Sequence, residues 1–242
     1  MSAILFFSDL HLGDSRNSIA YEEENLASLG SLIRRRKYAA VINLGDTVSR
    51  KEFLRDNMSA EEVFEKYRRW RDALGVPFRE CTIYRERGFF EEFFGQKADS
   101  CWEDIPGTAV ITLSPDDVED HQCSAAQWQW LSEMLDRTAG KTVLIGSHVP
   151  YPGCCSRPVT PGIYLPIDDA VRQKLENHQG AVFWAGGHFH WHDDPPLHQG
   201  SLTAFVGGRF LLETHPDRYT YVREVDLDTL AVRTLTDLTC EK

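Results

Sequence analysis

The chain has 242 residues, of which 42% are hydrophobic, enough for one sizeable α/β domain or at most two small ones. Its 26 Lys and Arg residues against 37 Asp and Glu residues give a formal charge of −11. This charge disfavours binding to nucleic-acid polymers and to anionic membranes. Bound divalent cations would cancel part of it locally, so a small anionic substrate remains compatible with the composition.

The sequence predicts a cytoplasmic protein without a membrane-spanning segment. No run approaches about 18 apolar residues, and the apolar start of the chain is too short for a signal peptide. The six cysteines form neither a C-x-x-C pair nor a zinc-finger spacing. We therefore expect reduced thiols without a chemical role.

Short apolar runs alternate with segments of helical periodicity through most of the chain. The runs predict strands at residues 3–9, 38–46, 78–83, 108–114, 141–148 and 181–188. Helical spacing predicts helices at 21–37, at 59–74, from 124 onward and near 167–176, two of which open with a capping-box pattern at Ser59 and Ser124. After His192, four strand-like runs with tight connections predict an antiparallel meander. This order indicates an α/β fold with at least one mixed sheet.

Polar side chains follow several of these predicted strands, at the point where each strand ends. They are Asp9, His11, Asp46, His148, His188 and His190. Ligands of open α/β sheets bind at the carboxyl ends of the strands, so these six groups are expected to converge. Converging carboxylates and imidazoles are unfavourable unless they ligate metal, and this mixture suits Mn²⁺, Fe or Zn²⁺. The pattern therefore predicts one or two divalent metal ions.

The histidines at 188, 190 and 192 lie in the stretch GGHFHWH, residues 186–192. Alternating histidines arise by chance in surface loops, but they also present two imidazoles from one strand end to a metal ion. Two ligands do not fill a coordination sphere, so the metal interpretation needs partners elsewhere in the chain. His192 is either a surface-loop residue or a group that contacts the substrate.

Four short blocks resemble, in their order, the blocks of the calcineurin-like metallophosphoesterases. They are SDLH at 8–11, GD at 45–46, SHVP at 147–150 and GHFH at 187–190. The segment SAAQWQWL at 124–131 is similar to the helix before the H-x-P strand in the cyclic-nucleotide phosphodiesterase-like branch. The resemblance runs from residue 4 to about residue 190.

This resemblance implies a single metallophosphoesterase domain over residues 1–242, folded as a four-layer α/β/β/α sandwich with two mixed central sheets. The first metal would be held by Asp9, His11, Asp46 and His190. The second would share Asp46 and add His148 and His188. A hydroxide that bridges both metals would attack the phosphorus of a small phosphorylated substrate, so no side-chain nucleophile is needed.

One block of the family pattern, Gly-Asn-His followed by an acid, is missing. An ungapped comparison places Ile83, Tyr84, Arg85 and Glu86 at its positions. In the family the Asn completes the second metal site and the His assists the leaving group. Tyr84 could ligate only as a phenolate, and Glu86 offers an oxygen donor. Arg85 stays protonated and cannot act as a general acid, so it is either a solvated residue or a group that binds phosphate oxygens.

These observations predict a metal-dependent phosphoesterase, either a phosphatase or a phosphodiesterase, that diverges at the second metal site and at the family's catalytic His. Two alternatives remain. One is a non-catalytic scaffold or binding protein with the same fold, which would not need six metal ligands. The other is a metal-dependent hydrolase that cleaves a bond other than a phosphate ester.

Overall fold

A computed structural model describes residues 2–82, 87–115, 122–155, 165–189, 194–210, 213–214, 220–236 and 238. Its helices are α1 (Ile19–Arg36), η1 (Lys51–Phe53), α2 (Ala60–Asp72), α3 (Arg87–Phe94), α4 (Ala125–Arg137) and α5 (Asp169–Glu176). Its strands are β1 (Ala3–Phe7), β2 (Ala40–Asn43), β3 (Phe78–Glu80), β4 (Ser100–Ile105), β5 (Thr108–Thr112), β6 (Thr142–Ser147), β7 (Val182–Gly186), β8 (Leu197–Gln199), β9 (Leu202–Val206), β10 (Gly208–Arg209), β11 (Tyr221–Asp226) and β12 (Val232–Leu235).

The strands form two mixed sheets of six strands each. The first sheet has the order β10-β11-β1-β2-β3, with β12 also paired to β11. Its β1, β2 and β3 are parallel, and β11 runs antiparallel to β1. The second sheet has the order β4-β5-β6-β7-β9-β8, in which β5, β6, β7 and β9 are parallel. The strand pattern predicts at least one mixed sheet, and the family resemblance implies the two that are found.

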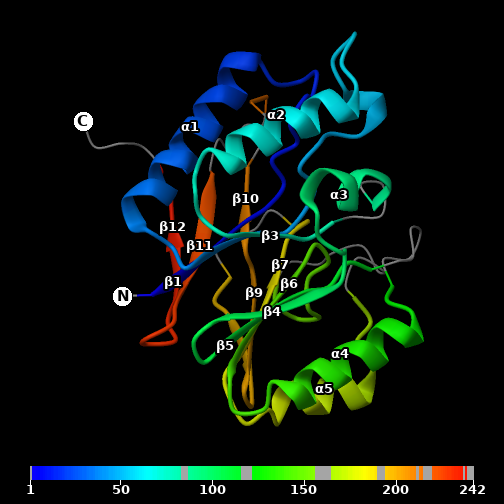
Figure 1. The fold of residues 1–242 in the computed structure, drawn as a ribbon, viewed down its shortest axis with the longest axis vertical. Helices are drawn as coiled ribbons and strands as arrows, with labels where there is room; N and C mark the ends of the chain where they lie inside the picture. Colours follow the sequence, from blue (N-terminus) through cyan, green and yellow to red (C-terminus); the bar gives the residue numbers. More distant parts are fainter. Residues whose placement is uncertain are drawn as a thin grey trace.

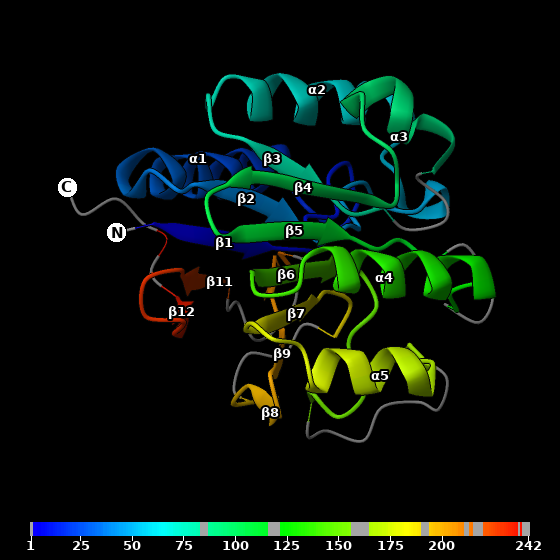
Figure 2. The same cartoon turned by 60° about the horizontal axis from the view of Figure 1, so that its bottom comes forward.

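The two sheets stack face to face, and helices cover both outer faces. Helices α1, α2 and α3 lie on the first sheet, and α4 and α5 lie on the second (Figures 1 and 2). This arrangement is the predicted α/β/β/α sandwich. Both faces of each sheet are therefore buried, which explains why its central strands read as continuous apolar runs instead of alternating ones.

Three apolar clusters fill the spaces between the four layers. Phe7 packs beneath α1 and α2, and the next residue back along β1, Phe6, points the other way into the space between the sheets. There its ring meets that of Phe205 from the second sheet, with centroids 5.5 Å apart and edge to face. Trp184 belongs to the third cluster, between the second sheet and α4 and α5. Each central strand thus contributes to two clusters.

The helix starts confirm the capping-box predictions. The Ser59 hydroxyl accepts from the backbone N–H of Glu62 and the Glu62 carboxylate accepts from the backbone N–H of Ser59, which opens α2. Ser124 and Gln127 make the same reciprocal pair at the start of α4. Each pair satisfies two N–H groups that the helix itself leaves without partners.

The predicted meander is wrong in one respect, because its strands are divided between the two sheets. Strand β9 lies parallel to β7 in the second sheet, whereas β10, β11 and β12 form an antiparallel set in the first. The chain crosses from one sheet to the other at Gly207. The strand pattern could not reveal this crossing, because strands of either sheet have the same apolar character.

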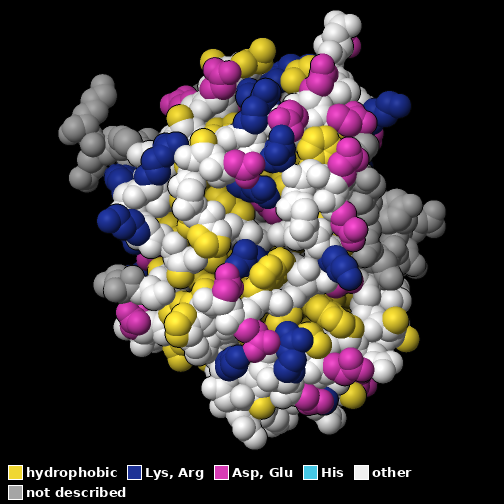
Figure 3. All heavy atoms as spheres, viewed as in Figure 1, with side chains coloured by type: hydrophobic (Ala, Val, Ile, Leu, Met, Phe, Trp, Pro, Cys, Tyr) yellow, Lys and Arg dark blue, Asp and Glu magenta, His cyan; other side chains and the backbone are white. Residues whose placement is uncertain are grey.

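Two further observations bear on partners. On the face of the molecule shown in Figure 3, Lys and Arg side chains are interspersed with Asp and Glu side chains and do not form one basic surface. Among the helices of the described residues, none is both long enough and apolar enough to cross a membrane.

The crossing at Gly207 yields a stability prediction. A Cβ atom at this position would lie 2.3 Å from Leu44 Cδ1 and 3.2 Å from Phe6 Cβ. Gly207→Ala should therefore lower the free energy of unfolding by about 1–3 kcal/mol through overpacking between the sheets. Gly30→Ala, in α1, is the control, since its nearest neighbours would be at an ordinary 3.4 Å. If urea unfolding shows that Gly207→Ala is as stable as Gly30→Ala, or more stable, this account is contradicted.

Candidate metal centre

The predicted ligands that the structure describes lie at the carboxyl ends of neighbouring parallel strands. Asp9 and His11 follow β1, and Asp46 follows its neighbour β2 in the first sheet. His148 follows β6, and His188 follows its neighbour β7 in the second sheet. Because the two sheets stack, these four strand ends bring five side chains to one place.

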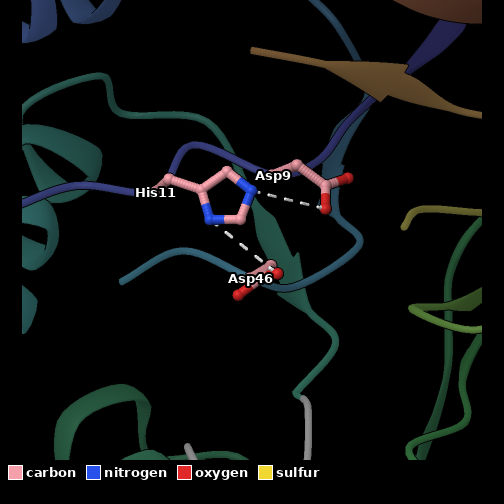
Figure 4. A group of neighbouring side chains, drawn as sticks. All are labelled: Asp9, His11 and Asp46. Atoms are coloured by element: carbon pink, nitrogen blue, oxygen red, sulfur yellow. Dashed lines mark ion pairs between the residues drawn. The ribbon is translucent and has the colours of Figure 1, made fainter. Parts of the chain in front are cut away.

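Three of these residues, Asp9, His11 and Asp46, form a compact group (Figure 4). Each offers one ligand atom, and these atoms all lie within 4.8 Å of one another. The imidazole of His11 sits between the two carboxylates, with Nε2 4.0 Å from Asp9 Oδ1 and Nδ1 3.8 Å from Asp46 Oδ2. Asp9 is fully buried, and the His11 side chain is 18% exposed.

Contacts between the sheets extend this group to His148 and His188. Asp46 Oδ2, the oxygen near His11, is also 4.0 Å from His148 Nε2. The rings of His148 and His188 lie 5.2 Å apart, and the backbone N–H of His188 donates to Asp9 Oδ2 at 3.0 Å. The five residues therefore form a closed ring of neighbours, with Asp46 between one histidine of each sheet.

A backbone carbonyl sets the tautomer of His148. Its Nδ1 lies 3.0 Å from the carbonyl oxygen of Leu44, which can only accept a hydrogen bond. The proton therefore resides on Nδ1, and the Nε2 lone pair is directed to the side of Asp46. A histidine fixed in this way by a carbonyl is the usual arrangement of a metal ligand.

The backbone at four of these residues is left-handed. The φ angles are +60° at Asp9, +46° at His11, +55° at Asp46 and +69° at His188. Positive φ is uncommon outside glycine and costs on the order of 1–3 kcal/mol for each residue. Such conformations persist only where the surroundings enforce them, and they concentrate at functional sites.

Two buried acids support the loop that carries His11. Glu22 of α1 accepts from the backbone N–H of Gly13 at 3.0 Å and pairs with Arg55 at 2.6 Å. Burial raises the pKa of Glu22, and Arg55 partly offsets that increase. Asp14 accepts from Ser49 and from Arg16; although its burial alone would raise the pKa, these bonds lower it to about 2. The loops after β1 and β2 are thereby tied together.

The two sheets approach each other closely beside His148. A Cβ atom at Gly187 would lie 2.1 Å from Ser8 Oγ and 3.0 Å from His148 Nδ1. Only glycine fits at this position, which precedes His188. The Gly before the first histidine of the GHFH block is therefore required by the contact between the sheets.

Three of the predicted site residues, His190, His192 and Arg85, lie outside the described residues, as do Tyr84 and Glu86. The structure brings together the other five. The sequence pattern did not reveal the supporting residues. They are Glu22 and Arg55 at the loop after β1, and Asn43 and Glu80 at the loop after β2, where Asn43 bonds to Gly45 and to Glu80. A sequence signal existed for Asn43, a polar residue that ends the otherwise apolar strand β2.

The donor set fits a divalent metal ion. Two ligand atoms bound to one ion at about 2.0–2.2 Å each lie at most about 4.4 Å apart. The 4.0 Å between His148 Nε2 and Asp46 Oδ2 meets this limit. One ligand atom from each of Asp9, His11 and Asp46 lies within 4.8 Å of the other two, a spacing close to the limit. Carboxylate and imidazole groups together suit Mn²⁺, Fe or Zn²⁺.

The arrangement predicts different effects for two substitutions. Asp46→Asn should weaken the binding of every metal equivalent, because Asp46 Oδ2 faces histidines of both sheets. His188→Ala should spare the first equivalent, since the group of Asp9, His11 and Asp46 remains. Calorimetric titration with Mn²⁺ measures both, and Asp136→Asn, an exposed acid of α4, is the matched control. The second metal site lacks the family's Asn and should bind its ion more weakly than the first. Two equally tight sites in the wild-type chain would therefore show that another donor completes the second site.

The fold is shared with solved structures of other proteins. No protein-family profile and no curated protein sequence matches the chain. Among solved structures, a dimetal phosphatase from Danio rerio is similar, with 16% identity, a TM-score of 0.69, and coverage of 97% of this chain and 98% of that one. The sulfate thiohydrolase SoxB from Thermus thermophilus, in complex with glycerol, is similar at 14% identity with a TM-score of 0.57. This chain is covered to 98% in that match but spans only 57% of SoxB. The chain thus has the fold expected from its resemblance to the calcineurin-like metallophosphoesterases.

Proposed function

We propose that this chain is a metal-dependent phosphoesterase that hydrolyses a small phosphate mono- or diester. The observation that carries the proposal is the ring of contacts among Asp9, His11, Asp46, His148 and His188 at the carboxyl ends of both sheets. The fold shared with a dimetal phosphatase supports it. Strands β1 and β11, from the two ends of the chain, share one sheet, which supports treating residues 1–242 as a single domain.

We assign the first metal to Asp9, His11, Asp46 and His190, and the second to Asp46, His148 and His188. Bound at these residues, two divalent cations supply an activated water and charge stabilisation for the phosphate oxygens. Asp46 is the shared ligand, because one of its oxygens faces both His11 and His148.

The residues of the chain also prepare the site for an anionic substrate. Burial of Asp9 and His148 keeps water from competing for these ligands, and the Leu44 carbonyl holds His148 in the tautomer whose Nε2 can ligate. Arg85 would bind phosphate oxygens where the family carries its catalytic His, since a guanidinium stabilises charge but gives up no proton.

The alternative of a non-catalytic scaffold explains the site less well. A scaffold needs neither ligand atoms at metal-binding separations nor left-handed backbone at four of the ligand positions. A second candidate, a hydrolase of a non-phosphate bond, is favoured by one observation, the fold shared with a sulfate thiohydrolase. A substrate panel that includes thiosulfonate esters alongside phosphate esters distinguishes the two.

Metal removal tests the proposed function. Dialysis against a chelator should lower the turnover of p-nitrophenyl phosphate or bis(p-nitrophenyl) phosphate by more than about 10²-fold, because the charge stabilisation is lost. Added Mn²⁺ or Zn²⁺ should restore it. A chain that binds metal with the expected stoichiometry but hydrolyses neither ester nor a thiosulfonate would support the scaffold instead.

The missing histidine predicts a steep dependence of rate on the leaving group. General acid help is worth roughly 10²–10⁴-fold, and Arg85 has no proton to give at neutral pH. Nitrophenyl esters should therefore react far faster than alkyl esters. Arg85→Ala should lower turnover by about 10- to 1000-fold if Arg85 contacts the phosphate. Arg85→His restores the family's residue type and should flatten the dependence.

A shallow dependence in the wild-type chain would mean that another acid is present, and His192 is the next residue to replace. Unchanged turnover in Arg85→Ala would assign Arg85 to the solvated surface.

A further inference from the structure

Asn43, the last residue of β2, is fully buried and contacts the turn that carries Asp46. Its Oδ1 accepts from the backbone N–H of Gly45 at 3.2 Å. Its Nδ2 lies 2.8 Å from Thr47 Oγ1 on the other side of Asp46. One amide side chain thus bonds to the residues before and after the candidate shared ligand.

Two residues from other elements hold this amide in place. Asn43 Nδ2 lies 2.8 Å from Glu80 Oε2 on β3 and 3.0 Å from the Tyr67 hydroxyl on α2. Tyr67 donates in turn to Glu80 at 3.1 Å, and Arg71 adds a bond to the same carboxylate at 3.4 Å. Tyr67 is 0% and Glu80 1% exposed, so water cannot replace these partners. We call Asn43, Tyr67 and Glu80 the Asn43 cluster.

The turn beside the cluster is one that needs support. Gly45 and Asp46 are consecutive residues with φ of +97° and +55°. The backbone oxygens of Gly45, Asp46 and Thr47 accept from the N–H groups of Asp9, His11 and Leu12 at 2.9–3.1 Å. A shift of the turn would therefore also move the loop that carries Asp9 and His11.

We propose that the Asn43 cluster positions Asp46, and through it the whole metal centre. This inference rests on the proposed function, because it assigns a role toward the metals that Asp46 would bind. The hydrogen bonds of the cluster go to the turn and among its own members, and not to the Asp46 carboxylate, so its three residues are positioning residues. Glu80 anchors the Asn43 amide, the amide fixes the Gly45–Asp46 turn, and the turn aims the Asp46 carboxylate.

The same sheet provides a matched control at its other end. Tyr38 is buried and donates to the buried Glu224 at 2.9 Å, and Arg36 pairs with that carboxylate, as Arg71 pairs with Glu80. Glu224 lies opposite Leu5 of β1. Leu5 is four residues before Asp9, or about 13 Å along an extended strand. Tyr67→Phe and Tyr38→Phe thus each remove a buried hydroxyl bonded to a buried carboxylate that also pairs with arginine, one near and one far from the metal centre.

Cobalt binding tests the proposal without relying on catalysis. Titration with Co²⁺ is followed by calorimetry and by the visible absorption of the bound ion. Tyr67→Phe should bind Co²⁺ about tenfold more weakly and show an altered spectrum, because loss of a residue that orients a metal ligand typically weakens binding by about that factor. Tyr38→Phe should bind Co²⁺ like the wild-type chain, although it too loses a buried hydrogen bond to a carboxylate. Glu80→Gln keeps an acceptor for Asn43 and should retain most of the affinity that Glu80→Ala loses.

Each result has one meaning. Wild-type affinity in Tyr67→Phe, or equal losses in both tyrosine variants, would overturn the positioning role while leaving the proposed function intact. A folded wild-type chain that takes up no Co²⁺ and hydrolyses no ester would overturn both. If Glu80→Ala does not fold, the pair of tyrosine variants still decides.

Discussion

The candidate metal centre depends on a backbone constraint: the chain turns through left-handed conformations directly after three of the strands that reach it. Asp9, His11, Asp46 and His188 all have positive φ, so each strand end bends sharply where its functional side chain is attached. A strand that simply continued would carry its side chains alternately to the two faces of the sheet. The bends instead bring carboxylates and imidazoles from both sheets together at the edge where the strands end.

These conformations are held by contacts between the sheets, so site and fold depend on each other. The N–H of His188 donates to Asp9, and the ring of His148 bonds to the Leu44 carbonyl, each across the space between the sheets. Gly187 permits the close approach, because no side chain fits between its backbone and Ser8. The apolar cluster between the sheets supplies the stability that offsets the strained turns, and the polar contacts at its end set the register of one sheet on the other.

Much of this arrangement could be predicted from the sequence, because parallel strands place their carboxyl ends at a common edge. Six apolar runs gave β1, β2, β3, β5, β6 and β7, and the polar residues after four of these runs gave the candidate ligands. The placement of β9 could not be predicted, since an apolar run followed by a turn fits either sheet. Strands β4 and β8 were missed because they lie at the edges of the second sheet. Both are partly exposed, so they lack the continuous apolar sequence of the buried central strands.

The residues behind the ligands were beyond sequence reasoning for a different reason. Tyr67 falls on the apolar face of α2, where an aromatic side chain is expected for packing alone, and Glu80 ends a strand of three residues. Only the fold reveals that both meet Asn43. Glu80 also lies three residues before Ile83, where the family's Gly-Asn-His block is replaced. The anchor of the Gly45–Asp46 turn therefore precedes the altered block in the chain, so the proposed loss of the family's Asn and His would leave in place what holds Asp46.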